Sequence, residues 1–260
     1  MQDFYGDTPF IIGNKKHIER KKRENIQSAG ISGRFLVRLT VLFISVIAIG
    51  STFVFRALFT VQAESRTYYA VCFYDGQSKS AAETVRNDII ASGGSGYMIC
   101  SGAYKVYGGM YAKRSDADAV AARKSNAFVE TFGWEQTKMR FSSHAEAVNV
   151  KNALSFYTEV ADKLVESVSL VIKEEESSVT IKAYVAAACK KFSEYSASVS
   201  DEKLSLLFER AAVSVKALEE CDGADFLSVL RFVSQDLAVL RGALETKIKY
   251  ENGSKSLSFW

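Results

Sequence analysis

Apolar residues follow three different patterns along the chain, and each pattern predicts a different kind of structure. The first is a run of 17 uncharged residues between Arg38 and Arg56. At about 1.5 Å of rise per residue, a helix over this run is roughly 26 Å long, close to the thickness of a bilayer's hydrocarbon core. Because apolar residues would lie on all sides of it, we predict a transmembrane helix over 35–59, after a cytoplasmic basic tail, residues 1–34.

The second pattern covers residues 64–140, where short aromatic and β-branched runs alternate with glycine clusters. These runs predict strands, at 67–74, 97–100, 103–109 and 127–132. Two amphipathic stretches, 78–91 and one that opens at Ser115, predict helices. The resulting order is β-α-β-β-α-β, a split-βαβ domain in which two helices cover one face of a four-stranded antiparallel sheet and the other face stays open.

The third pattern is a helical repeat of apolar residues over 142–252. Four stripes predict helices, at 144–172, 178–198, 201–219 and 225–250. Ser143, followed three residues later by Glu146, is typical of a capping box at the start of the first helix. Short connections favour antiparallel neighbours, so we expect an all-α four-helix antiparallel bundle that folds independently, followed by a tail, residues 253–260. The fold class is therefore α+β.

Charge around the apolar run predicts its orientation. From Lys15 to Arg38 the chain has eight Lys or Arg against two Glu, and an excess of cations marks the cytoplasmic side of a membrane helix. Residues 1–60 have a balance of +5, so the whole-chain charge of +3 leaves −2 for residues 61–260. We therefore expect a cytoplasmic N-terminus, extracytoplasmic C-terminal domains and no nucleic-acid partner. A cleaved signal peptide ending at Val61-Gln62-Ala63 is the alternative.

The four cysteines all follow the apolar run. They are Cys72, Cys100, Cys189 and Cys221. An even number in an oxidising compartment permits disulfides, and the pair Cys189 and Cys221 is favoured because both lie in the helical region. The alternative is that all four are small apolar core residues.

Sequence signals for catalysis and cofactors are weak. The histidines are His17 and His144, on opposite sides of the predicted membrane helix, so a nucleophile activated by histidine would depend on His144 alone. There is no Walker loop, HExxH or paired-cysteine metal motif. We therefore predict no catalytic residue, metal or cofactor, and a protein that is not an enzyme. A carboxylate pair of the glycosidase kind is the alternative left open.

Two segments resemble the SPOR (sporulation-related) domain family. YAVCFYDGQSKSAAE, from Tyr69, resembles the family's first strand and helix, Y-x-V-Q-x-G-x-F-x-x-x-x-x-A-E. YKVYGGMYAKRSDADAVAARK, from Tyr104, resembles its second half, Y-R-V-x-x-G-P-F-x-x-x-x-x-A. The residues that keep the pattern are Tyr69, Val71, Ala82, Glu83, Tyr104, Val106, Gly109, Tyr111 and Ala117. The resemblance covers about a quarter of the chain.

The resemblance implies binding to peptidoglycan, particularly to glycan strands without stem peptides, at a division or sporulation septum. The family's ligand lies on the open sheet face, where strand alternation places Cys72 and Tyr74 beside Lys105 and Tyr107. A tyrosine ring offers a flat surface to a sugar, and Lys105 offers a cation to a muramic carboxylate. The departures from the pattern are Cys72 for Gln, Tyr74 for Gly, Lys105 for Arg, Gly76 for Phe and Met110 for Pro.

Two functions are compatible with these patterns. In the first, a membrane-anchored protein binds denuded glycan through the SPOR-like domain. The helical bundle then either contacts a partner, such as a protein of division or sporulation, or positions the SPOR-like domain away from the membrane. In the second, the departures have abolished glycan binding, and the outer part is a non-enzymatic structural or interaction protein of a membrane-associated complex.

The predicted topology can be tested by proteolysis. We expect protease added to intact protoplasts to remove the outer part of the chain and to spare residues 1–34, because the basic flank holds the N-terminus inside. Immunoblots against tags at each end measure this. A secreted fragment that begins at Glu64 would show instead that the apolar run is a cleaved signal peptide.

Overall fold

The computed structural model describes residues 41–47, 59–221 and 223–252, with side chains up to residue 244. The chain divides into two units, Met1–Ser51 and Thr52–Trp260. In the first, residues 41–47 are helical, and most of the predicted span 35–59 lies outside the described residues, as do the tails 1–34 and 253–260. Within the part that is described, none of the helices combines the length and the apolar character that crossing a bilayer requires.

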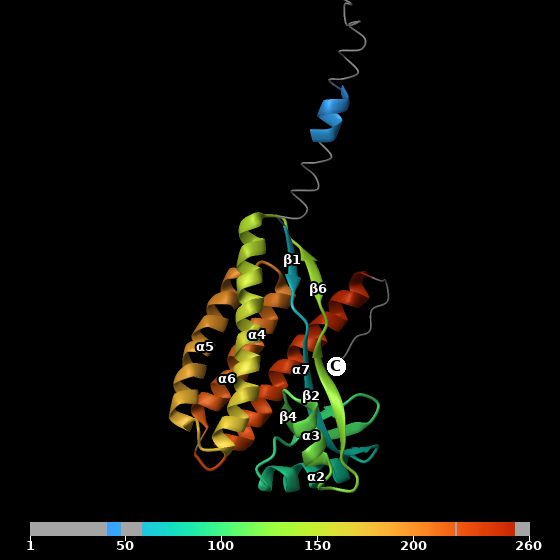
Figure 1. Cartoon of the computed structure of the whole chain (residues 1–260), viewed down its shortest axis with the longest axis vertical. Coiled ribbons are helices and arrows are strands. Elements are labelled where there is room, and N and C mark those ends of the chain that lie inside the picture. Colours follow the sequence, from blue (N-terminus) through green and yellow to red (C-terminus); the bar gives the residue numbers. More distant parts are fainter. Residues whose placement is uncertain (1–40, 48–58, 222, 253–260) are drawn as a thin grey trace, which may run out of the picture. The chain divides into compact units, whose positions relative to one another are not determined.

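The second unit is α+β and begins with two antiparallel sheets (Figure 1). The larger has the strand order β3-β4-β2-β5. Its elements are β2 (Arg66–Gly76), α2 (Lys79–Ala91), β3 (Tyr97–Cys100), β4 (Tyr104–Tyr111), α3 (Arg114–Ala121) and β5 (Phe128–Trp134). The predicted order β-α-β-β-α-β is confirmed. The smaller sheet, β1 (Thr60–Ala63) with β6 (Thr137–Arg140), was not predicted, because its four-residue strands, TVQA and TKMR, contain no aromatic residue.

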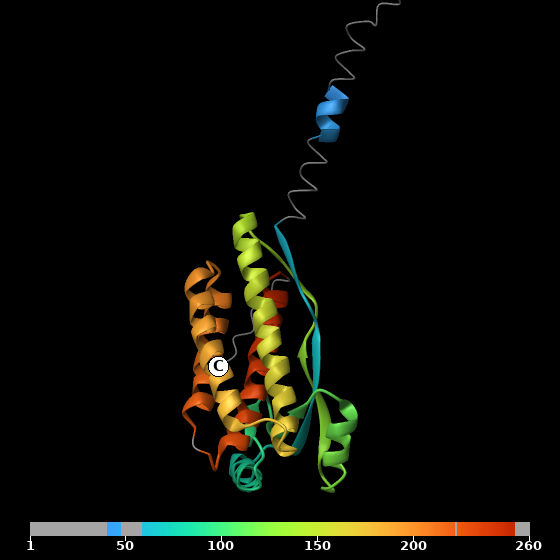
Figure 2. The same ribbon diagram turned by 60° about the vertical axis from the view of Figure 1, so that its left-hand side comes forward.

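Four helices follow, and their predicted positions are confirmed to within two residues (Figures 1 and 2). They are α4 (His144–Ile172), α5 (Ser178–Ser198), α6 (Glu202–Glu220) and α7 (Phe226–Asn252). The Ser143 hydroxyl accepts a hydrogen bond from the Glu146 amide at 3.1 Å, as a capping box requires. The Glu146 carboxylate accepts from the Ser142 hydroxyl at 2.9 Å.

The sheet and the helices share one core, because α7 lies between the sheet on one side and α4 and α6 on the other. The face of the sheet toward α2 and α3 buries a small cluster around Val71 and Ala117. The opposite face belongs to the main core, with Cys72 fully buried and Tyr107 2% exposed. The expectation of an open sheet face is therefore wrong over this area. The predicted boundary at residue 142 is a connection within one packed unit, not a gap between two separate cores.

Polar contacts fix the position of α7 on the sheet. Ser95 donates to the Gln235 side chain at 3.2 Å, and Tyr97 donates to Asp236 at 3.0 Å. The Arg231 guanidinium donates to the Gly93 carbonyl oxygen. On the other side of α7, the buried Tyr157 hydroxyl of α4 donates to the Leu237 carbonyl oxygen at 2.7 Å. The helix is thus held in one register by directional bonds as well as by apolar burial.

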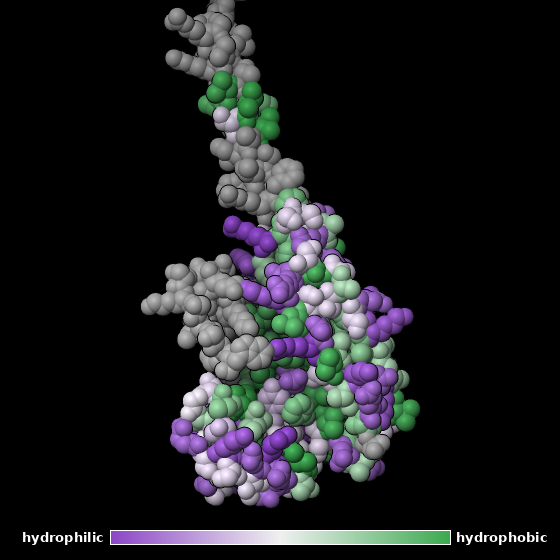
Figure 3. Space-filling view, turned by 180° about the vertical axis from the view of Figure 1, so that it is seen from behind, coloured by the Kyte–Doolittle hydropathy of each residue, from purple (hydrophilic) through white to green (hydrophobic). Residues whose placement is uncertain are grey.

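The view from behind shows polar and apolar side chains mixed over the surface (Figure 3). Leu206 and Val213 of α6 and Phe232 of α7 are exposed, and they line a groove of about 570 Å³ between the two helices. Leu207 and Leu237 on the same helices are buried. Each of the two helices therefore packs one apolar stripe against the core, and a few apolar side chains at the edge of that stripe remain exposed.

The helical cysteines do not lie opposite each other. Cys189 of α5 donates from its thiol to the Ala212 carbonyl oxygen of α6 at 3.5 Å. Cys221 follows Ala212 by nine residues, which separates the two cysteines by about 13 Å along α6. A disulfide requires Cα atoms less than about 7 Å apart, so the favoured pairing of Cys189 with Cys221 is wrong, and all four cysteines are free thiols.

A close backbone approach joins α7 to β5. A Cβ atom added to Gly242 would lie 2.7 Å from the carbonyl oxygen of Gly133, and Gly133 itself has a φ of 137°. Only glycine brings two backbones this close, and only glycine adopts that φ without strain.

We expect Gly242→Ala to destabilise the α+β unit by about 1–3 kcal/mol, because the new methyl group meets backbone that has no side chain to move aside. In an exposed helix the same change would stabilise by about 1 kcal/mol. Urea unfolding followed by circular dichroism measures the difference. Gly223→Ala is the control, since nothing lies within 4 Å of the added Cβ, and equal effects of both substitutions would contradict the role given to this contact.

Candidate functional site

The four residues predicted to bind glycan are only partly brought together. Cys72 pairs with Tyr107 across β2 and β4, so these two side chains share a sheet face as predicted. The next pairs are Tyr74 with Val106 and Asp75 with Lys105, so β2 contains one extra residue between Cys72 and Tyr74. Such a β-bulge reverses the alternation of side chains beyond it. Asp75, and not Tyr74, therefore lies on the face of Lys105 and Tyr107.

Tyr74 lies on the α2 side of the strand. Its hydroxyl donates to the Ser78 carbonyl oxygen at 3.1 Å, and its ring occupies the space beside Gly76. The prediction that Tyr74 shares a face with Lys105 is therefore wrong, and the reason is the bulge. Cys72 is fully buried in the core that the sheet shares with the helices, so its thiol is not available to a ligand in this packing.

A sheet-face cluster of Asp75, Lys105, Tyr107 and Glu130 lies at the end of the sheet that the helices leave partly open. Lys105 forms ion pairs with Glu130 and, at 3.7 Å, with Asp75. The Tyr107 hydroxyl donates to the second oxygen of Glu130 at 2.5 Å. The side chains of Lys105 and Glu130 are 31% and 27% exposed. Lys105 is thus engaged by two carboxylates, and a muramic carboxylate would have to compete with them.

The cluster borders a cavity of about 460 Å³. The residues that line it are Ile99, Ser101, Ala103, Lys105, Tyr107, Glu130, Thr131 and Phe132. The Phe132 ring packs edge-on against Tyr107, with ring centroids 5.0 Å apart. An aromatic surface next to a charged, hydrogen-bonding pair can hold a polar ligand with one flat apolar face.

Sequence reasoning missed Asp75, Glu130 and Phe132. Glu130 interrupts the apolar run AFVETF that predicted the last strand. An acidic residue in such a run was the sequence signal that could have marked Glu130 as a site residue. Asp75 was missed because a single-residue bulge leaves no mark in the alternation itself.

Lys105 and Tyr107 of the cluster both stay protonated at neutral pH. Burial, and then the hydrogen bond to Glu130, raise the pKa of Tyr107 far above its ordinary value, so the phenol stays a donor. The hydrogen bond to Glu130 raises the pKa of Lys105, so the amine stays cationic. Burial raises the pKa of the Cys72 thiol to about 11.

Within the described residues no group of three or more His, Cys, Asp or Glu side chains is placed to hold a metal ion. His144, the one histidine among the described residues, is exposed at the start of α4. Comparison of the chain with protein-family models, with curated proteins and with solved structures finds no match in any of the three.

Burial of Cys72 predicts its reactivity. With a pKa of about 11, only about 0.1% of this thiol is thiolate at pH 8, and the surrounding core excludes reagents from it. We expect iodoacetamide at pH 8 to alkylate the exposed Cys100 at least 100-fold faster than Cys72, as measured by mass spectrometry of tryptic peptides. In 6 M guanidinium chloride the two should react alike. Fast labelling of native Cys72 would show that the sheet face is open.

Proposed function

We propose that the chain is a single-pass membrane protein whose outer part is a non-enzymatic interaction module of the cell envelope. The observation that carries this proposal is the position of α7. A SPOR-like sheet offers its free face to glycan, whereas here Cys72 and Tyr107 of that face are buried in a core shared with the helices. The sheet therefore serves first as a packing platform for α7.

The membrane anchor in this proposal is the uncharged run at 39–55 with its basic flank. The SPOR-like identity of the sheet is supported by the quoted sequence patterns and by the order of strands and helices. We infer that residues 59–252 lie outside the cytoplasm and contact proteins of a membrane-associated complex, with division or sporulation as the setting that the resemblance suggests.

Glycan binding at the sheet-face cluster is the second candidate function, and one observation favours it. The cavity beside Lys105, Glu130 and Phe132 remains accessible although α7 covers the rest of the face. An aromatic ring with charged hydrogen-bonding neighbours is suited to a sugar. If the protein binds glycan in this way, the glycan contacts one end of the sheet and not its centre.

Sacculus pelleting separates the two candidates. We expect the full chain, in mild detergent, to sediment no more with amidase-treated sacculi than with intact ones, because the central sheet face is unavailable. Enrichment on denuded sacculi that Phe132→Ala abolishes would establish the glycan candidate instead. Phe128→Ala is the matched control, since Phe128 is an exposed residue of the same strand outside the cavity lining. Both variants should be checked for an unchanged thermal transition.

A further inference from the structure

Among the residues that the structure describes, no strand pairs with one edge of β1, which we call its free edge. On the other side β1 pairs with β6, in the register Val61 with Met139, Gln62 with Lys138 and Ala63 with Thr137. The Phe141 amide donates to the Phe59 carbonyl oxygen at 2.9 Å, which marks that pair as hydrogen-bonded. Hydrogen-bonded and non-hydrogen-bonded pairs alternate in an antiparallel ladder. The backbone N–H and C=O of Gln62 therefore point away from β6, toward the free edge.

This edge forms one wall of a concave feature that α4 closes on the other side. The α4 cleft, as we name it, has a volume of about 520 Å³. Its lining residues are Val61, Gln62, Ala63, Glu64, Arg66, Lys151, Leu154, Ser155, Thr158, Glu159, Asp162, Lys163, Glu166 and Tyr184. The strand wall is about 17 Å long and the helix wall about 22 Å long. The strand wall therefore has the length of roughly five extended residues.

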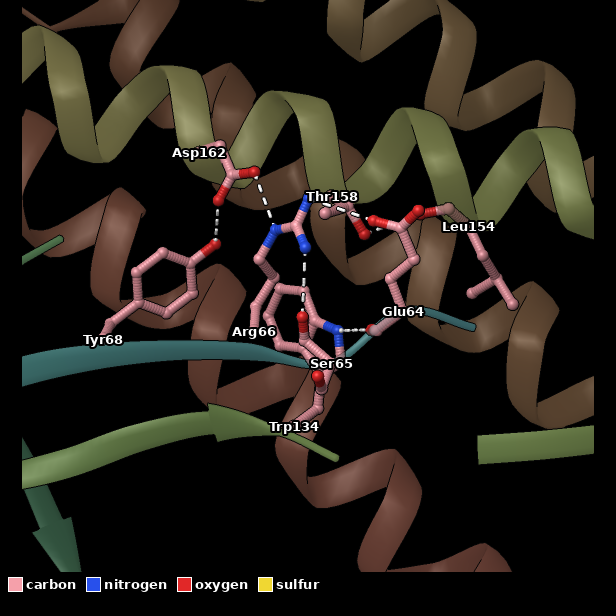
Figure 4. Close-up of polar contacts among 8 residues, drawn as sticks. All are labelled: Glu64, Ser65, Arg66, Tyr68, Trp134, Leu154, Thr158 and Asp162. Atoms are coloured by element: carbon pink, nitrogen blue, oxygen red, sulfur yellow. Dashed lines mark hydrogen bonds and ion pairs between the residues drawn. The ribbon is translucent and has the colours of Figure 1, made fainter. Parts of the chain in front are cut away.

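Hydrogen bonds fix the inner end of the α4 cleft (Figure 4). The Arg66 guanidinium donates to Asp162 at 3.0 Å and pairs with Glu64 at 3.1 Å. Tyr68 donates to the other Asp162 oxygen at 2.7 Å. Figure 4 shows these side chains bridging the gap between the strand and α4. The bridge sets the distance between the two walls, so the cleft is preformed.

The α4 cleft carries more negative than positive charge. Its acidic residues are Glu64, Glu159, Asp162 and Glu166, and its basic residues are Arg66, Lys151 and Lys163. Lys163 is bound at 2.9 Å by Glu176, a carboxylate from outside the cleft. Glu159 and Glu166 are exposed on one side of α4, seven residues apart, which is about 10 Å. Side chains on one face of an extended peptide repeat about every 7 Å, so lysines can reach both.

We propose that the α4 cleft binds an extended peptide with basic side chains, which adds to the free edge of β1 as a third strand. Backbone bonds to Gln62 supply the strand pairing, and the carboxylates of α4 select cationic residues. The inference deepens the proposed interaction function by naming a kind of partner. Its test uses no sacculi, so each proposal can fail without the other.

The probe is the fluorescein-labelled peptide Lys-Val-Lys-Val-Lys, titrated with the full chain in detergent at low salt and followed by anisotropy. We expect a Kd below 1 mM, and at least tenfold weaker binding of Glu-Val-Glu-Val-Glu. The double variant Glu159→Gln with Glu166→Gln should weaken binding of the lysine peptide at least tenfold. Absence of binding by the lysine peptide, or equal binding of both peptides, overturns the proposal.

Gln62→Pro tests the strand pairing itself. It removes the edge N–H but no ladder bond to β6, and proline is tolerated on edge strands, so we expect at least tenfold weaker binding with an unchanged thermal transition. Gln62→Ala keeps the N–H and should bind within twofold of the wild type. A second test changes the peptide and leaves the protein as it is. Binding is compared for two peptides, one N-methylated on the valines and the other on the lysines. One of these two must lose binding; if both bind like the parent, strand addition is refuted.

Discussion

Packing of α7 against the four-stranded sheet is the constraint on which the rest of residues 59–252 depends. The sheet has two apolar faces, and α2 and α3 are long enough to cover one. The other face presents Cys72, Tyr107 and Met110, all buried in the structure, and burial of such residues contributes about 1.5–3 kcal/mol each. α7 supplies that burial. Because it also contacts α4 and α6, the helices gain their fixed position from the sheet.

The bulges of the sheet decide which side chains reach its polar end. One extra residue in β2 moves Asp75 into the place that regular alternation gives to Tyr74. A second irregularity lies between Ala70 and Cys72, opposite Gly108 and Gly109 of β4. Bulges commonly re-aim side chains near functional sites. Here they place an acid–base pair, Lys105 with Glu130, next to an aromatic ring at the open end.

The Arg66–Asp162–Tyr68 bridge links the four-stranded sheet to the helices at a second point. Its side chains come from β2 and α4, far from the sheet-face cluster along the same strand. Burial, and then the hydrogen bond to Asp162, raise the pKa of Tyr68 well above its usual value. The hydrogen bond to Asp162 raises the pKa of Arg66. Both groups therefore remain donors at physiological pH.

Local patterns in the sequence determined the elements. Stripes of apolar residues located α4 to α7, and aromatic and β-branched runs located β2 to β5, because helical and strand periodicities differ strongly. The placement of Cys72 and Tyr107 on one face of the sheet also followed from alternation. The tertiary structure alone decided that α7 covers the sheet, since an apolar stripe says that a helix is buried but not against what. It also decided the bulge, the β1–β6 pair and the cleft, because these arise from contacts between segments distant in sequence, whose register no local pattern encodes.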